Sequence, residues 1–170
     1  MHHAKTKILA IDPGTREMGI VLLEGPSLIH HAVKTIRNRS SAHEILKEGR
    51  KIILRLLDDF RPGVLAVEKT FLSGKRTALF NVFADEILSL GKKKGIKVMS
   101  IAPNTVKKFI CGDGRATKEE VAQVVVGRFP ELKVYLNQNS KWKMRYHENM
   151  FDAVALALTC ADRMSRSSQH

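Results

Sequence analysis

The chain has 170 residues, enough for one domain with its own hydrophobic core, and no apolar run in it approaches the roughly 18 residues of a membrane span. It carries 29 Lys and Arg against 17 Asp and Glu, which gives a formal net charge of +12. A small domain this basic usually binds a polyanion, most often nucleic acid, although such a charge also aids solubility.

The first part of the chain predicts an antiparallel meander. Apolar runs at residues 7–11, 19–23 and 28–35 have the length of strands, and tight-turn sequences separate them at 12–15 (DPGT) and 24–26 (EGP). Three strands joined by turns this short pair with alternating direction.

The remainder alternates helices with strands. Apolar periodicity predicts helices over 41–60, 77–94, 103–111, 117–129 and 147–163, with strands at 64–67 and 97–101. Strands that alternate with helices imply parallel pairing. We therefore expect one α/β domain over residues 1–170, built on a mixed five-stranded sheet flanked by helices. Residues 130–146 are expected to be irregular, and residues 164–170 to form a disordered tail.

The cysteines and the N-terminal sequence indicate the compartment. Cys111 and Cys160 adjoin apolar residues and have no partners at metal-ligand spacing, as is typical of reduced, buried thiols. Residues 1–12 lack the long apolar segment of a secretory signal. We therefore expect a cytoplasmic protein.

Three acidic residues stand out because each adjoins an apolar segment that the fold must bury. Asp12 and Glu68 end predicted strands, and Asp152 opens the apolar stretch AVALAL. Each has an ordinary explanation on its own: a turn residue, an exposed strand end, and a charge that interacts with a helix dipole. Burying an unpaired carboxylate is costly, however. Three of them at the ends of core elements together favour a shared metal cation.

Two neighbours of Asp152 extend this candidate metal site. Glu148 and Asn149 lie four and three residues before it, at positions that share a helix face. A cluster of oxygen ligands with several carboxylates suits Mg²⁺, or Mn²⁺ in its place, rather than zinc. Such ions can flank a scissile phosphate, so the cluster in a basic protein predicts phosphodiester cleavage.

Taken in order, the motifs resemble those of the RuvC-type Holliday junction resolvases. The resemblance rests on ILAIDPGTREMG at 8–19, AVEKTF at 66–71, TVKK at 105–108, GDGRATKEEV at 112–121 and FDAVALA at 151–157. Any one of these motifs is weak, but the ordered set is specific and extends over nearly the whole chain.

The resemblance implies an RNase H-like fold, a homodimer, and Mg²⁺-dependent nicking of DNA strands at a four-way junction, with a branch-migration helicase as a possible partner. It also implies that Asp12, Glu68 and Asp152 are the metal ligands. Phe71 would stack on an unpaired base, unless it packs in the core or at the dimer interface. The matching motifs also make Lys107 and Lys118 candidates for phosphate contact near the scissile bond, and three further basic residues are candidate DNA contacts: Lys75, Arg76 and Arg115.

One position departs from the family pattern. Resolvases usually carry Asp or His three residues before the final Asp, whereas this sequence has Asn149. An amide offers only a neutral oxygen, and Glu148 could supply the missing charge. The sequence leaves the fourth ligand open between Glu148 and Asn149, and weak catalysis is an expectation consistent with either.

Two alternative functions and the dimer interface stay open at this point. The first alternative is another RNase H-like nuclease that cuts flaps or RNA–DNA hybrids, and the second is a catalytically weak DNA-binding module. The suggested interface is an apolar face of the helix from 77 to 90, where four residues recur: Ala78, Val82, Ile87 and Leu90.

Overall fold

The computed structural model describes residues 6–69, 74–136 and 141–167, apart from the side chains of 75–77 and 141–145. In chain order its elements are β1 (Lys7–Asp12), β2 (Glu17–Glu24), β3 (Ser27–Thr35), α1 (Ala42–Phe60), β4 (Val64–Glu68), α2 (Lys75–Lys93), β5 (Lys97–Ile101), α3 (Pro103–Cys111), α4 (Lys118–Arg128), the 3-10 helix η1 (Pro130–Leu132), α5 (Lys133–Leu136) and α6 (Lys141–Ser167).

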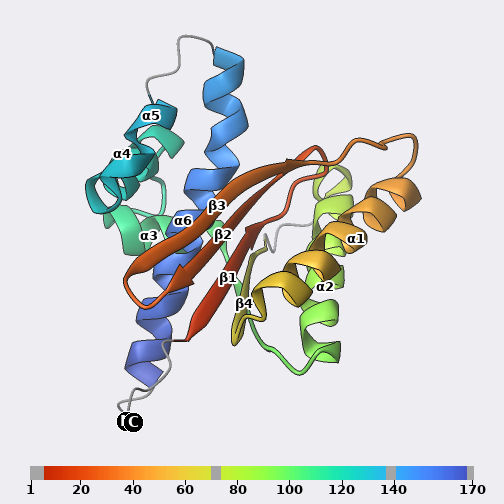
Figure 1. Cartoon of the computed structure of the whole chain (residues 1–170). Coiled ribbons are helices and arrows are strands. Elements are labelled where there is room, and N and C mark those ends of the chain that lie inside the picture. The colour runs from red at the N-terminus through yellow and green to blue at the C-terminus, as the bar shows by residue number, and fades with distance from the viewer. Residues whose placement is uncertain (1–5, 70–73, 137–140, 168–170) are drawn as a thin grey trace.

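One five-stranded sheet forms the centre of the molecule, in the order β3-β2-β1-β4-β5 (Figure 1). β1, β2 and β3 pair antiparallel, while β4 and β5 continue the sheet beyond β1 in parallel. The short turns between the first three strands allow only reversal, whereas α1 and α2 provide the crossovers that parallel strands need. The mixed α/β sheet expected from the sequence is confirmed.

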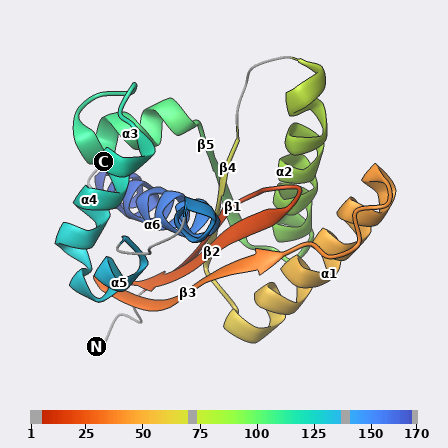
Figure 2. The ribbon, with the colours of Figure 1, turned by 90° about the horizontal axis from the view of Figure 1, so that it is seen from above.

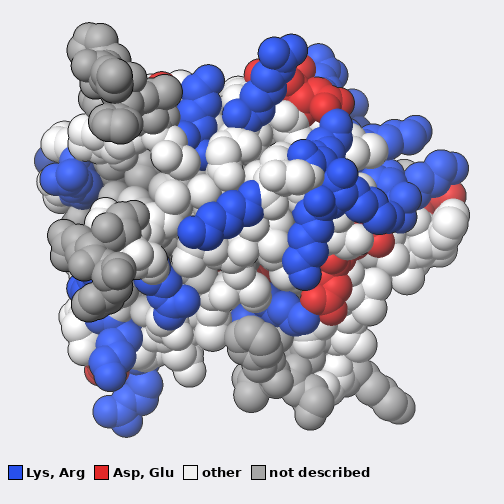
Figure 3. Space-filling model, turned by 90° about the horizontal axis from the view of Figure 1, so that it is seen from below, with Lys and Arg blue, Asp and Glu red and all other residues white. Residues whose placement is uncertain are grey.

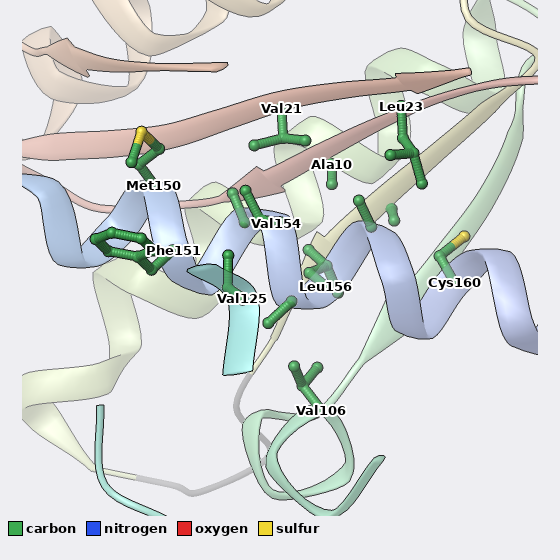
Figure 4. Close-up of a cluster of buried hydrophobic side chains, with 14 of the residues drawn as sticks. Ala10, Val21, Leu23, Val106, Val125, Met150, Phe151, Val154, Leu156 and Cys160 are labelled. Atoms are coloured by element: carbon green, nitrogen blue, oxygen red, sulfur yellow. The ribbon is translucent and has the colours of Figure 1, made fainter. Parts of the chain in front are cut away.

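Helices cover both faces of the sheet (Figures 1 and 2). α1 and α2 pack on the face that contains Leu9 and Ile11, and α6 packs on the face that contains Ala10. Successive side chains of a strand point to opposite faces, so β1 contributes to both cores. Figure 4 shows Ala10 of the sheet above Val154 of α6. α3 and α4 pack on the side of α6 away from the sheet.

The final helix is longer than the sequence predicts. Periodicity indicates a helix over 147–163, but α6 spans Lys141–Ser167. No Gly or Pro interrupts this segment, and at its end Asp162 forms an ion pair with Arg166 at 2.9 Å, one helical turn away. The tail expected at 164–170 is therefore helical as far as the structure describes it.

The described residues of the segment 130–146 are also more regular than expected. It contains η1, α5 and the start of α6, and Leu132 within it is fully buried. The Tyr135 ring lies 4.6 Å from that of His147, measured between centroids. These tertiary contacts order a stretch that has little apolar periodicity of its own, which is why the prediction was wrong.

Helix α2 does not present the single apolar face suggested for dimerisation. Ile87 and Leu90 are buried in the core with Phe83, whereas Val82 is 51% exposed and Ala78 is also exposed. The grouping of these residues is therefore wrong, because their spacing places them on two sides of the helix.

Two further expectations concern the thiols and membranes. Cys160 is buried as expected, Cys111 is only half-buried, and both are free. Within the described ranges, no helix is long and apolar enough to cross a membrane.

Candidate active site

The pairing of β1 with β4 brings two of the candidate carboxylates together. The strands are parallel neighbours, with Ile11 opposite Val67, so the residues that end them lie at the same edge of the sheet. Asp12 ends β1 and Glu68 ends β4. Strand alternation directs both side chains to the face that contains Ala10, which α6 covers.

Helix α6 supplies the third carboxylate and closes one side of a cavity of about 360 Å³. Asp152 lies on α6 directly before a run of fully buried residues, so packing of the helix fixes its position. The polar residues that line the cavity are Asp12, Thr15, Arg16, Glu17, Glu68, Lys107, Lys118, Asn149 and Asp152. The three carboxylates singled out from the sequence thus converge on one cavity.

Burial and mutual repulsion make these acids hard to ionise together. Burial raises the pKa of Asp12 well above its usual range, and the charges of Glu68 and Asp152 raise it further. The pKa of Glu68 is raised to about 8, first by burial and then by Asp152. Burial also raises the pKa of Asp152, against the lowering effect of Lys118. A positive charge is needed to hold all three as carboxylates at neutral pH.

The chemistry of this cluster fits a divalent cation. Carboxylate and amide oxygens are the ligands that Mg²⁺ and Mn²⁺ prefer. Across the described parts of the chain, however, no three Asp, Glu, His or Cys side chains stand close enough together to coordinate one ion. The side chains must therefore adjust to enclose a cation, although their backbone positions are already set.

Lys118 contacts two carboxylates of α6, those of Asp152 and Glu148. Its ammonium group lies 3.2 Å from Asp152 Oδ2 and 3.4 Å from Glu148 Oε2. Burial opposes its charge, but Asp152 and Glu148 raise the pKa of Lys118 overall. Lys118 is the first residue of α4, and a capping box between Thr117 and Glu120 fixes this helix start.

The structure separates Glu148 from Asn149, which helix spacing alone could not do. Asn149 lines the cavity, and its Nδ2 donates to the carbonyl oxygen of Glu17 at 2.9 Å. Glu148 is not among the cavity-lining residues and contacts Lys118 instead. The two residues therefore serve different neighbours, even though both lie one turn before Asp152.

Gly19 allows α6 to approach the sheet closely enough for this arrangement. A Cβ atom at Gly19 would lie 1.7 Å from the carbonyl oxygen of Asn149, which no real contact permits. Gly19 is also the strand partner of Asp12. A side chain at this position would push the start of the Asn149–Asp152 turn away from the strand that ends in Asp12.

The candidate DNA-binding residues divide into three groups. Lys107 and Lys118 line the cavity, as a role at the scissile phosphate requires. Arg115 lies outside it, exposed and 3.8 Å from Asp113. Phe71 and the side chains of Lys75 and Arg76 lie outside the described residues.

Sequence reasoning missed several residues of the cavity. Arg16 and Glu17 line it because β2 begins beside the end of β1, and Phe80 reaches it from α2. Arg16 and Glu17 lie inside the motif at 8–19, and their place in that motif was the signal that could have identified them as cavity residues. Nothing in the pattern of α2 distinguished Phe80 from a core residue.

The strand order and the acidic cluster define an RNase H-like α/β protein, the class expected from the motifs. Comparison with known sequences then gives the family. The sequence model of Crossover junction endodeoxyribonuclease RuvC matches residues 8–160. The chain belongs to the RuvC family, and the resemblance inferred from its motifs is confirmed.

Relatives and solved structures agree with this assignment. RuvC of Rickettsia prowazekii is 29% identical over 159 residues, covering 90% of this chain and 95% of its own. RuvC of Afipia carboxidovorans is 34% identical, covering 68% and 71%. Thermus thermophilus RuvC in complex with a Holliday junction substrate superposes with a TM-score of 0.72 at 26% identity, covering 96% and 97%. The yeast mitochondrial Holliday junction resolvase Ydc2, at 12% identity and a TM-score of 0.71, supports the fold alone.

Proposed function

We propose that the protein is a structure-specific DNA endonuclease that cleaves Holliday junctions by metal-dependent phosphodiester hydrolysis. The observation that carries the proposal is the cavity in which Asp12, Glu68 and Asp152 meet Lys107 and Lys118. Carboxylate oxygens for a cation and lysines for a phosphate line the same cavity. The chain also aligns almost end to end with a RuvC that was solved in complex with a Holliday junction. The formal charge of +12 suits DNA as the substrate.

In this proposal the carboxylates of Asp12, Glu68 and Asp152 would hold Mg²⁺, with Mn²⁺ as a substitute. A divalent ion held there would supply Lewis-acid chemistry for hydrolysis of the scissile phosphodiester. The chain itself positions the DNA strand: Lys107 and Lys118 bind its phosphate oxygens, and the surrounding walls orient it. Lys118 can do so only by giving up part of its contact with Asp152, which a bound cation would favour.

We infer that Asn149 is the fourth ligand and that Glu148 is the charge partner of Lys118. Asn149 faces the cavity, and because its Nδ2 is engaged by Glu17, its Oδ1 is the atom left for a cation. Glu148 is not among the cavity-lining residues, and its Oε2 lies 3.4 Å from the Lys118 ammonium group. A neutral amide is a weaker ligand than Asp, so this protein should need a higher Mg²⁺ concentration for cutting than a family member with Asp at this position.

Resolution of a four-way junction needs two symmetric cuts, so we propose a homodimer with both active sites on one side. A branch-migration helicase is a proposed partner, the cytoplasm is the proposed compartment, and residues 1–170 are proposed to act as a single nuclease domain. Phe71, Lys75, Arg76 and Arg115 are proposed DNA contacts near the junction centre.

The test is a cleavage assay on four-way, flap and plain duplex DNA with Mg²⁺ or Mn²⁺. The wild-type protein should cut the four-way junction preferentially, and Asp12→Asn should abolish cutting while junction binding persists. Asp59→Asn, an exposed change on α1, is the matched control and should cut normally. Full activity of Asp12→Asn, or equal cutting of all three substrates, would refute the proposal.

A further inference from the structure

The loop between β3 and α1, residues 36–41, leaves the sheet at the edge where β3 ends (Figure 1). Antiparallel pairing brings the end of β1, the start of β2 and the end of β3 to this edge. The backbone N–H of Ile36 donates to the carbonyl oxygen of Arg16 at 2.8 Å, and Arg16 lines the cavity. The loop is therefore tied directly to the rim of the cavity.

Carboxylates of α1 hold the backbone of this loop. Glu48 accepts hydrogen bonds from the backbone N–H groups of Arg37 at 3.0 Å and Asn38 at 2.6 Å, and these bonds hold its pKa below the usual range. The Asn38 side chain donates to Glu44 at 3.0 Å. The side chains of Arg37 and Arg39 are exposed. The loop is thus a braced support that presents two arginines to solvent.

We propose that Arg37 and Arg39 bind the phosphate backbone of the DNA arm whose scissile strand enters the cavity past Arg16. This inference rests on the proposed nuclease function and adds the path of the substrate. Neighbouring strands lie about 4.8 Å apart, which places β3 roughly 10 Å from the end of β1. A DNA strand advances about 3.4 Å per nucleotide along the helix axis. Because the strand also winds around the axis, this rise is the smallest spacing between successive phosphates, and the loop meets phosphates at most about three nucleotides from the scissile bond.

The two arginines suit this task in charge and geometry. A guanidinium binds two phosphate oxygens at once, and a loop with a fixed backbone loses little entropy when its side chains engage. Lys107 and Lys118 line the cavity from α3 and α4, and α3 follows β5, the strand at the edge of the sheet opposite β3. Cations on both sides of the carboxylates let a continuous strand cross the acidic cavity without net repulsion.

The opposite end of the molecule provides a control for this proposal. Figure 3, which views the molecule from below, shows Lys and Arg side chains gathered on that face as well. Lys92 and Lys93 are exposed at the end of α2, which lies at the edge of the sheet where β4 and β5 begin, opposite the ends of β1 and β4 that carry Asp12 and Glu68. Removing them changes the net charge by the same amount as removing Arg37 and Arg39. Long-range attraction alone would make the two pairs equivalent, whereas direct phosphate contact would not.

The experiment compares Arg37→Gln/Arg39→Gln with Lys92→Gln/Lys93→Gln, both in the Asp12→Asn background so that bound DNA stays intact. Four-way junction affinity is measured over roughly 0.05 to 0.3 M NaCl. The arginine pair should lower the slope of log K against log salt by about 2, close to 0.9 per phosphate, and weaken binding at least tenfold. The lysine pair should keep both values near those of the parent. Unchanged melting temperatures would show that both variants fold.

A second measurement locates the contact on the DNA. Neutral methylphosphonates replace the phosphates about one to three nucleotides from the cut site on one arm. They should weaken binding of the parent but not of Arg37→Gln/Arg39→Gln. Equal losses for the arginine and lysine pairs, or full sensitivity of the arginine variant to the neutral linkages, would overturn the inference. Failure of the proposed junction function would appear separately, as a parent protein that binds plain duplex as tightly as a four-way junction.

Discussion

Replacing Asp12 by Asn should make the cation-free protein more stable, although it abolishes cutting. Asp12 is only 6% exposed, and both its burial and the neighbouring Glu68 and Asp152 oppose its ionisation. An amide of the same shape removes that repulsion and leaves the packing intact. Relief of active-site strain of this kind typically adds about 0.5–2 kcal/mol. At roughly 2–4 °C per kcal/mol for a chain of this size, the melting temperature should rise by about 1–8 °C.

The pH dependence follows from the raised pKa values. The pKa of Glu68 rises from 4.5 in the unfolded chain to about 8 in the fold, so its contribution to stability is full below about pH 4.5 and lost as the pH rises toward 8. Asp12 and Asp152 shift in the same direction. Thermal melts in EDTA should therefore show wild type and Asp12→Asn nearly equal at pH 5 and well separated at pH 8.

The control for this prediction is Asp59→Asn, whose exposed carboxylate should change the melting temperature by little at either pH. Added Mg²⁺ should raise the melting temperature of the wild type more than that of Asp12→Asn, because the cation replaces the missing positive charge. If Asp12→Asn melts below the wild type at pH 8 without cation, the carboxylate cluster is not a source of strain and the reasoning fails.

Three further predictions test the surroundings of the cluster. Gly19→Ala should lower both stability and cutting, because its Cβ would overlap the carbonyl oxygen of Asn149. Gly127→Ala, which has open space around it, should stabilise the fold by about 0.4–1 kcal/mol. Equal melting temperatures for these two variants would contradict the prediction. Lys118→Met should reduce the cutting rate by roughly 10²-fold or more while weakening junction binding far less, as single-turnover and binding assays can show. Asn149→Ala should raise the Mg²⁺ concentration for half-maximal cutting by about tenfold or more, and Glu148→Gln should raise it less; the reverse order would make Glu148 the ligand.

Much of the fold could be predicted from the sequence because local signals and tertiary structure agree there. The turns at 12–15 and 24–26 follow apolar runs of strand length, and the structure pairs the three strands as the antiparallel meander that these turns predict. Asp12 and Glu68 could be found for the same reason. A carboxylate that ends a fully buried strand must meet whatever ends the neighbouring parallel strand.

The sequence-based predictions failed where tertiary contacts, and not local sequence, determine the structure. The start of α6 has polar and aromatic residues without apolar periodicity, and partners outside the helix hold it in place. The Tyr146 hydroxyl donates to the carbonyl oxygen of Val33 at 3.3 Å, and the His147 ring lies 4.6 Å from the Tyr135 ring, measured between centroids. Glu148 and Asn149 posed a similar problem. Spacing places both near Asp152, and only the position of the Glu17 carbonyl separates their directions.

Helix α6 explains how the fold supports an acidic cavity that opposes its stability. Directly after Asp152, the five residues 153–157 are fully buried, and their contacts with the sheet offset the cost of burying one carboxylate. The backbone position of Asp152 is therefore set by apolar packing and not by a cation. Core packing and cation binding should then respond separately to substitution. A truncation such as Val154→Ala would lower the melting temperature with little change in the Mg²⁺ requirement, while changes at Asp152 itself would act on the cation first.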